Sequence, residues 1–558
     1  MAPSITDHRC PACNAGFEHT GVSGLVECEY CGTKFEITAP DRAAAAPETD
    51  NKSPADKSKI WIATGKEPVY MVSKMVNRHG LVAGATGTGK TVTIKVMAEA
   101  FSKMGVPVFM ADIKGDVSGL CRAGEPNKNV DERVQSMKIP NFAYTGFPVR
   151  FFDVYGNSGI PVRTTISEMG PLLLSRILGL NETQTGILQI LFKIADDNGL
   201  LLIDLKDLRA MAQFAGDNAK ELTTVYGNIS TQSIGTIQRN LLTLSSGGGD
   251  TFFGEPALDL HDWLACDEKG RGFINILNCV KLFQNPQLYS TFLLWMLSEL
   301  YEMMPEVGDL EKPKMVFFFD EAHILFNEAP KALLQKVEQV IRLIRSKGVG
   351  IYFITQSPSD IPDSVLSQLG NKIQHALRAY TPKEQKAVKA AAASFRPNPG
   401  FSSETVLGEL STGEALISML DEKGAPRIVE RAFMLPPESY MGAAESERIV
   451  ELTRSCPLFS KYGQAIDRES AYEVLQKQKQ ESSAPRQTQP GNASRQTQPA
   501  QPVKAGAPKQ KQQTPSRPKT RSTKTSNPVN KALSSAMTQV GREAGKALIR
   551  GLLGTMKR

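Results

Sequence analysis

A glycine-rich stretch at residues 84–91 could bind the phosphates of a nucleotide. It consists of Gly84, Ala85, Thr86, Gly87, Thr88, Gly89, Lys90 and Thr91. Glycines let the backbone wrap around phosphate oxygens, Lys90 adds a charge for the β- and γ-phosphates, and the Thr91 hydroxyl can ligate Mg²⁺. An apolar run before the stretch and a helical pattern after it supply the strand and helix that such a loop requires. A glycine turn before an ordinary helix is disfavoured, so the sequence predicts binding of ATP with Mg²⁺.

Polar residues at the ends of two later apolar runs could complete this site. Asp320 and Glu321 directly follow the run at 315–319, and Gln356 follows the run at 349–355. In phosphoryl-transfer enzymes the first acid holds Mg²⁺, and the adjacent Glu321 is a candidate general base for water. Gln356 could sense the γ-phosphate, although a Thr-Gln-Ser turn without a ligand fits the same residues. Together with the phosphate loop, this pattern predicts ATP hydrolysis.

Three further features could serve the same chemistry. Residues 112–116 end an apolar run with polar groups, which either face a ligand crevice or cap the next turn. Arg345 and Arg378 could stabilise transition-state charge, within one subunit or from a neighbour. Surface solvation is the alternative role for each arginine.

Four cysteines near the N-terminus have the spacing of a structural metal site. Cys10 and Cys13 form one C-x-x-C pair, and Cys28 and Cys31 form a second. Four thiolates satisfy tetrahedral zinc and leave no open position for catalysis. Redox motifs or disulfides are the alternative, but the βαβ context of redox C-x-x-C motifs is missing. The sequence predicts a Zn²⁺-binding ribbon that the metal holds together.

The elements that must position the nucleotide residues indicate an α/β fold. Continuous apolar runs such as 315–319 and 349–355 suit strands buried on both faces of a parallel sheet. From 164 to 245 the apolar spacing becomes helical, which predicts a helical insertion. The Ser/Gly-rich residues 245–249 predict a loop or turn. The expected organisation is a zinc ribbon at 1–38, a linker at 39–59, an ATPase domain at 60–440, a helical extension at 441–475, a disordered basic linker at 476–528 and a C-terminal amphipathic helix at 529–558.

The charge is distributed unevenly along the chain. The net charge is +7 over 558 residues, yet residues 482–558 alone carry +14, so the remainder is mildly acidic. The Gln-, Pro- and Lys-rich composition of 476–528 predicts disorder, and its charge fits either a solvated tether or non-specific contact with DNA phosphates. No run is long and apolar enough for a membrane helix, and no signal peptide is visible, so we expect a cytoplasmic protein without membrane contact.

At this level of detail the chain resembles a bacterial family of HerA-like helicases. The resemblance extends from Ile60 to Leu435 and returns at 541–554. It is carried by residues 84–91, 112–116, 252–256, 315–323, 341–350, 365–371 and 374–378. It implies a RecA-like P-loop core of the additional-strand, catalytic-glutamate kind, and a homo-oligomer, usually a hexameric ring, that couples ATP hydrolysis to movement along DNA. HerA docks a nuclease through an N-terminal β-barrel, and only a short segment lies between the linker and the phosphate loop here, so a nuclease partner is not implied, whereas an unknown protein partner stays open.

Two expectations follow from this resemblance. The apolar stripe at 529–558 suits docking onto protein, and in HerA-type rings a C-terminal helix covers the ATP site of the adjacent subunit. The leading function is an ATP-driven DNA translocase or helicase. The alternative is an ATPase motor or nucleotide-gated scaffold that acts on protein partners. A scaffold needs no water-activating carboxylate, so the pair of Asp320 and Glu321 disfavours it.

Overall fold

Two separate units make up the chain, residues 1–56 and 57–558. The computed structural model describes residues 6–9, 16–19, 24–27, 34–37, 58–308, 310–327 and 331–483. The first unit contains two antiparallel strand pairs, β1 (Thr6–Arg9) with β2 (Gly16–His19) and β3 (Gly24–Glu27) with β4 (Lys34–Ile37). The four cysteines fall in the connections within these pairs, which lie outside the described residues, as does the predicted C-terminal helix.

A twelve-stranded mixed sheet forms the centre of the second unit, with the order β10-β9-β11-β8-β12-β13-β7-β14-β15-β16-β5-β6. The strands are β5 (Lys59–Thr64), β6 (Pro68–Val72), β7 (Gly80–Ala83), β8 (Val108–Asp112), β9 (Val149–Asp153), β10 (Ile160–Pro161), β11 (Ile274–Asn278), β12 (Met315–Phe319), β13 (Val349–Thr355), β14 (Asn371–His375), β15 (Glu414–Ser418) and β16 (Glu430–Met434). The strands from β10 to β14 are parallel, and those from β14 to β6 pair antiparallel. Because β13 lies between β7 and β12, the additional-strand arrangement is confirmed.

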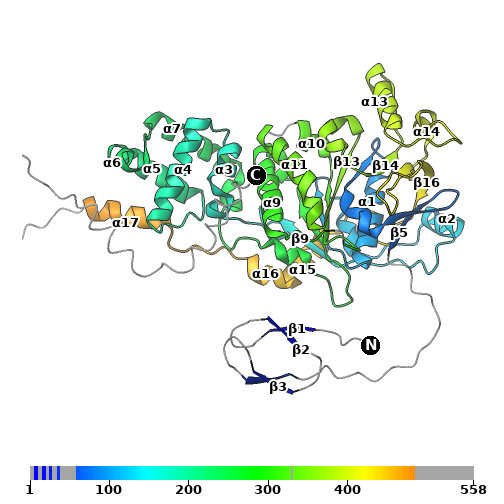
Figure 1. The fold of residues 1–558 in the computed structure, drawn as a ribbon, viewed down its shortest axis with the longest axis horizontal. Coiled ribbons are helices and arrows are strands. Elements are labelled where there is room, and N and C mark those ends of the chain that lie inside the picture. Colours follow the sequence, from blue (N-terminus) through cyan, green and yellow to red (C-terminus); the bar gives the residue numbers. More distant parts are fainter. Residues whose placement is uncertain are drawn as a thin grey trace, which may run out of the picture. The chain divides into compact units, whose positions relative to one another are not determined.

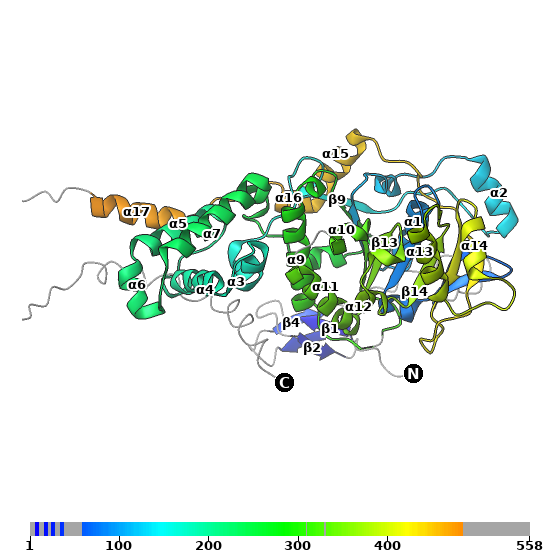
Figure 2. The same ribbon diagram turned by 90° about the horizontal axis from the view of Figure 1, so that it is seen from above.

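The parallel strands are buried on both faces, as their continuous apolar runs predict. Side chains alternate along β12, where Phe317 and Phe319 enter one apolar cluster and Phe318 enters the other. The helix α1 (Lys90–Lys103) packs on the face of Phe318. The opposite face is covered by α9 (Pro286–Met303), α10 (Ala322–Asn327) and α11 (Lys331–Leu343). Figures 1 and 2 show this layered core on the right.

A cluster of helices lies beside the sheet at the end where α9 is found (Figure 2). It comprises α3 (Ile166–Ile177), α4 (Glu182–Asp197), α5 (Leu205–Asp217), α6 (Ala219–Tyr226) and α7 (Thr231–Leu244). Residues 245–249, expected as a loop or turn, form a π turn that continues α7 into α8 (Asp250–Phe252). The glycines allow this continuation because Gly249 packs so tightly that a Cβ there would lie 2.9 Å from Leu205 Cδ1.

Residues 438–483 run back from the sheet to the helical cluster, and we call them the C-terminal strap. They contain α15 (Ser446–Ser455), α16 (Pro457–Tyr462) and α17 (Ala471–Ser483). α17 extends into the stretch expected to be disordered from residue 476. It does so because Ala471 is fully buried and Leu475 packs on the main apolar cluster, so the helix is supported by tertiary contacts that composition does not reveal.

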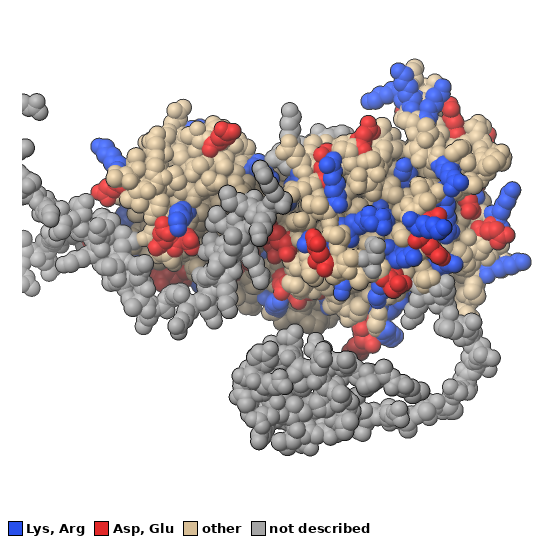
Figure 3. Space-filling model, viewed as in Figure 1, with Lys and Arg blue, Asp and Glu red and all other residues tan. Residues whose placement is uncertain are grey.

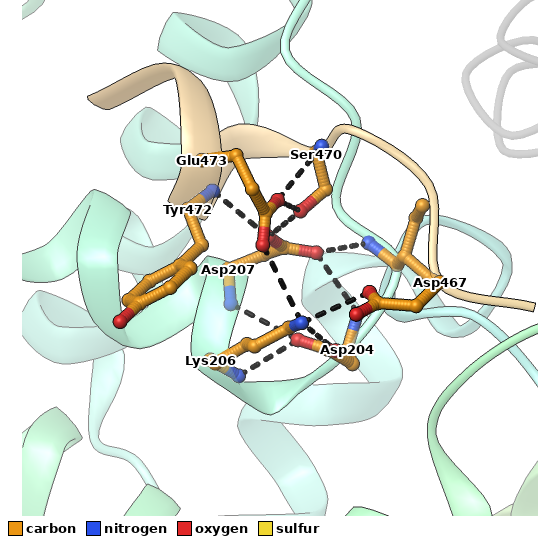
Figure 4. A network of polar contacts seen from close by, with 8 residues as sticks. Asp204, Lys206, Asp207, Asp467, Ser470, Tyr472 and Glu473 are labelled. Atoms are coloured by element: carbon orange, nitrogen blue, oxygen red, sulfur yellow. Dashed lines mark hydrogen bonds and ion pairs between the residues drawn. The ribbon is translucent and has the colours of Figure 1, made fainter. Parts of the chain in front are cut away.

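The strap is anchored at its far end to α5 (Figure 4). The fully buried Asp207 carboxylate accepts hydrogen bonds from the Ser470 hydroxyl (2.5 Å) and the Tyr472 N–H (2.9 Å). Its other oxygen caps the start of α5 by accepting the N–H groups of Ile203 and Asp204. One carboxylate therefore joins the strap to the helical cluster.

At its near end the strap is clamped to α1. Lys95, which is fully buried, donates to the carbonyls of Tyr440, Met441 and Gly442 at 2.9–3.2 Å. One turn further along α1, the buried Glu99 carboxylate accepts the N–H groups of residues 438 and 439.

Within the described part of the chain, no helix is both long and apolar enough to cross a membrane.

Candidate active site

The carboxyl ends of four adjacent parallel strands define the site. β8, β12, β13 and β7 lie side by side, and the registers place Ala111, Phe319 and Phe353 level with one another. Thr355 at the end of β13 pairs with Ala83 at the end of β7. Residues that follow these strands therefore meet at one edge of the sheet, where ligands bind in open α/β folds.

The phosphate loop at 84–91 connects β7 to α1 and is hydrogen-bonded to both neighbouring strands. Gly84 N donates to the Thr355 carbonyl (3.2 Å), and Ala85 N donates to the Ala376 carbonyl just after β14 (2.9 Å). A Cβ at Gly84 would lie 2.5 Å from His375 Cβ, and Gly89 has a φ of 115° at the start of α1. Glycine is therefore required at both positions, as the motif predicts.

Lys90 turns back into the loop. Its Nζ donates to the carbonyls of Gly84 (2.6 Å) and Ala85 (3.1 Å), and only 7% of the residue is exposed. Burial and the nearby charge of Lys114 lower the pKa of Lys90, while Glu321 and Asp320 oppose this effect. The ammonium group is thus held over the loop whose backbone would surround a phosphate.

Oxygen donors beside Thr91 suit a magnesium ion. The Thr91 hydroxyl donates to Asp116 Oδ2 at 3.0 Å, while Asp116 Oδ1 is buried without a hydrogen-bond partner among the described residues. Hydroxyl and carboxylate oxygens are the ligands that Mg²⁺ accepts, directly or through its waters. Asp112 caps its own turn by accepting the Gly115 N–H (2.7 Å). The capping role weighed for residues 112–116 is therefore filled by Asp112, and the role of Asp116 at a ligand stays a prediction.

Asp320 and Glu321 end β12 in different electrostatic surroundings. Burial raises the pKa of Asp320 to about 6, although Lys114 opposes the shift. Burial would also raise the pKa of Glu321, but the hydrogen bond and charge of Lys114 outweigh it and hold that pKa below its ordinary value. Lys114 Nζ lies 2.5 Å from Glu321 Oε1. The two adjacent carboxyls thus differ in how readily they ionise, which suits different roles.

The remaining predicted residues fall at different distances from this edge. Gln356 directly follows Thr355 and is exposed beside the phosphate loop. Arg378 lies three residues after β14 and donates to the Gly408 carbonyl (3.1 Å). Arg345 precedes β13, and its carbonyl accepts from Asn77 ahead of β7. Arg345 therefore lies at the opposite ends of the strands and does not reach its own subunit's phosphate loop.

His375 was not predicted as a site residue, yet it packs against the phosphate loop at Gly84 and contacts α1 at Thr93. This buried imidazole contacts the Thr93 hydroxyl through Nε2 and the Glu414 carbonyl through Nδ1, both at 2.9 Å. Because a carbonyl only accepts, Nδ1 carries the proton and Nε2 accepts from Thr93. Burial lowers the pKa of His375 to about 4, so the ring is neutral. The signal that could have indicated His375 is its position at the end of β14, the strand that pairs with β7.

Fold and site together define a P-loop fold with a RecA-like core. The chain belongs to the helicase HerA-like C-terminal family, whose model matches residues 57–558. The DNA double-strand break repair helicase HerA of Sulfurisphaera tokodaii is 24% identical over 362 residues, which cover 61% of this chain and 62% of that protein. The probable helicase MJECL08 of Methanocaldococcus jannaschii is 30% identical over 125 residues, 22% of each chain. The chain thus aligns with less than two thirds of either relative.

Solved structures with a similar chain course include TrwB and VirB4. The plasmid coupling protein TrwB in complex with ADP and Mg²⁺ has a TM-score of 0.47 and 14% identity, over 68% of this chain and 89% of TrwB. VirB4 of Thermoanaerobacter pseudethanolicus has a TM-score of 0.43 and 15% identity, over 68% of this chain and 98% of VirB4.

Proposed function

We propose that this chain hydrolyses ATP to move along DNA as a ring-shaped oligomer, in the manner of a HerA-like translocase or helicase. The observation that carries the proposal is the meeting of the phosphate loop, Asp320, Glu321 and Gln356 at one edge of the sheet. Family membership supports the choice of DNA, because one relative is named as a DNA repair helicase.

Each residue at this edge has a distinct role in the proposed reaction. The loop amides and Lys90 bind the β- and γ-phosphates, and Glu321 accepts a proton from the attacking water. Gln356 contacts the γ-phosphate from the neighbouring strand. Thr91 and Asp320 would hold Mg²⁺, with Asp116 accepting from Thr91. When bound, the ion neutralises charge on the β- and γ-phosphates.

ATP turnover with and without DNA tests this function. We expect duplex DNA to stimulate ATP hydrolysis by the full-length protein. Lys90→Ala should lose ATP binding, whereas Glu321→Gln should bind ATP normally and lose turnover, because the amide cannot accept the proton. If neither single- nor double-stranded DNA alters the rate, the motor function is wrong. If Glu321→Gln keeps full turnover, the assigned chemistry is wrong.

A basic helix offers a surface for the DNA backbone. α13 (Pro382–Ala393) projects from the core and carries the exposed Lys383, Lys386 and Lys389. Figure 3 shows lysine and arginine side chains gathered over this helix at the upper right. Tyr380, which is 85% exposed, lies just before it. Phosphate contacts through such lysines are independent of sequence and sensitive to salt.

Charge removal on α13 separates DNA contact from chemistry. Changing the three lysines of α13 to Gln should weaken duplex binding and reduce its salt dependence by about one unit of slope per lost contact. DNA-free ATP turnover should stay unchanged because the three lysine side chains are exposed and do not contact the phosphate loop in the described part of the chain. As a matched control, Lys128→Gln with Lys193→Gln removes exposed lysines elsewhere. Equal effects of both sets would argue against a specific DNA surface.

The proposal includes a homohexamer in which an arginine completes the neighbour's site. Both predicted arginines are candidates for contact across an interface. Arg345 lies at the opposite ends of the strands from its own phosphate loop, so it could serve only a neighbour's site. Arg378 lies two residues after Ala376, whose carbonyl accepts from the loop, so it could serve either site. Mixing Arg378→Ala with Lys90→Ala subunits tests this directly. If Arg378 acts on the neighbour, mixed rings contain interfaces with both groups intact, and turnover returns. Absence of recovery in rings shown to be mixed by mass would exclude a trans role for Arg378.

We also propose that the first unit binds zinc. Cys10 and Cys13 belong to the connection between β1 and β2, and Cys28 and Cys31 to that between β3 and β4. Two strand pairs that each carry a C-x-x-C connection suit one tetrahedral site. We expect about one zinc per chain by elemental analysis, lost in a Cys10→Ser and Cys28→Ser variant. An unchanged zinc content in that variant would refute the site.

A further inference from the structure

Lys114 makes a short contact with the proposed general base. It lies in the turn after β8, and Glu321 lies directly after β12, the neighbouring parallel strand. The Lys114 Nζ atom is 2.5 Å from Glu321 Oε1. The Glu321 side chain is 6% exposed and the Lys114 side chain is 42% exposed. The glutamate is therefore shielded from solvent, whereas the lysine is partly in contact with it.

The second carboxylate oxygen of Glu321 has no hydrogen-bond partner among the described residues. His323 Nδ1 lies 3.1 Å from Oε2, but the two atoms are not aligned for a hydrogen bond. Both atoms are buried and have no other hydrogen-bond partner in the described part of the chain. An unsatisfied buried oxygen in a native fold needs a reason, and a catalytic role is one of the few. Oε1 is thus held by Lys114, while Oε2 lies beside His323 without a hydrogen bond.

The backbone supports the same arrangement. Glu321 has a φ of 47°, in the left-handed region that a residue with a side chain rarely adopts. Its N–H donates to Asp320 Oδ1 at 2.9 Å, which fixes the turn. Strained residues that the surroundings hold in place are concentrated at functional sites. The strain and the ion pair together leave the carboxylate little freedom to rotate.

Lys114 makes its ion pair with Glu321 and not with the adjacent acid, although its charge also lowers the pKa of Asp320. Among the described residues, the ion pairs of Glu321 are with Lys114 and His323, whereas Asp320 accepts only a backbone N–H. A lysine that served only to neutralise the acidic edge could pair with either carboxylate. The contact with Oε1 instead selects the group that must face water.

We propose that Lys114 is a positioning residue that holds Glu321 through Oε1 and so presents Oε2 to the attacking water. The inference rests on the proposed ATP hydrolysis. A base restrained in this way makes its hydrogen bond to water without an orientational cost at the time of reaction. Loss of the ion pair lets the carboxylate rotate away, so turnover falls while nucleotide binding is preserved.

Steady-state kinetics of Lys114→Met and Lys114→Arg in the full-length protein test the inference. Methionine keeps the length of the side chain but not its charge, and we expect kcat to fall about tenfold to a hundredfold with KM for ATP within about twofold of wild type. Arginine can restore the contact with Oε1, so it should recover much of kcat. As a matched control, Lys193→Met removes an exposed pair with Asp197 (2.6 Å) on α4 and should leave kcat unchanged.

A double variant distinguishes positioning from direct contact with phosphate. If Lys114 acts through Glu321, then adding Lys114→Met to Glu321→Gln lowers single-turnover hydrolysis no further. A further fall, a raised KM, an unchanged kcat or an increased kcat for Lys114→Met would each overturn the inference. Loss of turnover in Glu321→Gln with a normal Lys114→Met would refute the positioning role alone. Full turnover in Glu321→Gln would instead refute the proposed chemistry.

Discussion

Glu99 on α1 offers a test of how the strap is clamped to the helix that carries the phosphate loop. Its Oε2 accepts the Glu438 N–H (2.9 Å), and its Oε1 accepts the N–H (3.1 Å) and hydroxyl (2.6 Å) of Ser439. The carboxyl group is only 4% exposed. Burial raises its pKa to about 7, although the three donors oppose the shift. Glu99→Gln keeps the shape of the side chain and removes its titration.

The magnitude follows from the difference in pKa between the folded and unfolded chain. Glu99 ionises near pH 4.5 when unfolded and near pH 7 when folded. Between these values the folded chain binds more protons, so the free energy of unfolding decreases as the pH rises. The contribution of Glu99 is complete below pH 4.5 and lost above about pH 7. A shift of this size corresponds to about 3 kcal/mol of stability, which the wild-type protein loses as the pH rises. The Glu99→Gln variant has no titrating group at this position and therefore keeps its stability.

Unfolding midpoints of wild type and Glu99→Gln, measured at pH 5 and pH 8, check this reasoning. Other titrating groups cancel in the difference between the two proteins. We expect the variant to gain most of about 3 kcal/mol relative to wild type on going from pH 5 to pH 8. Exposed Glu132→Gln on α2 (Lys128–Met137) is the matched control and should show no such change. Parallel pH profiles of wild type and Glu99→Gln would refute the argument.

Three further changes have expected outcomes of their own. Gly84→Ala places a Cβ about 2.5 Å from His375 Cβ and should weaken nucleotide affinity about tenfold or more in a fluorescence titration, because the loop must move. His375→Phe leaves the buried Glu414 carbonyl without its donor and should lower the free energy of unfolding by about 1–3 kcal/mol in denaturant titrations. In Asp207→Asn the new amide N–H group replaces one of the two accepting oxygens and faces hydrogen-bond donors. Amide exchange at the start of α17 should therefore become faster, while exchange in the sheet stays unchanged.

Much of the chemistry at the sheet edge could be predicted from the sequence. The phosphate loop, Asp320 and Glu321 are local patterns, because a strand, a tight turn and a helix fix their positions within a few residues. Gln356 required only that its strand be a neighbour of the others, and β13 does lie between β7 and β12. Such features depend on short-range geometry, which the order of residues encodes directly.

The contacts of Lys114 and His375 could not be predicted, because they join distant parts of the chain. Lys114 meets Glu321 across 207 positions of sequence because β8 and β12 are adjacent, and His375 reaches Thr93 across 282. The expectation of disorder from residue 476 was wrong at its start for the same reason. Composition alone describes α17 as polar, whereas Ala471 and Leu475 find an apolar surface on the helical cluster. Strand order and tertiary burial had to be seen.

The strap connects the nucleotide site to the helical cluster through a short series of contacts. α1 begins at the phosphate loop, and Lys95 and Glu99 on the same helix bind residues 438–442 with six hydrogen bonds. The strap then passes β9 and β10 and ends on Asp207 of α5. A rigid helix cannot move at its start without displacing its later turns. A nucleotide that shifts α1 must therefore either draw the strap along or break buried, charge-assisted hydrogen bonds, which cost about 1.5–3 kcal/mol each. Moving the strap with α1 keeps these bonds, and its anchor on α5 would then pass the motion to the helical cluster.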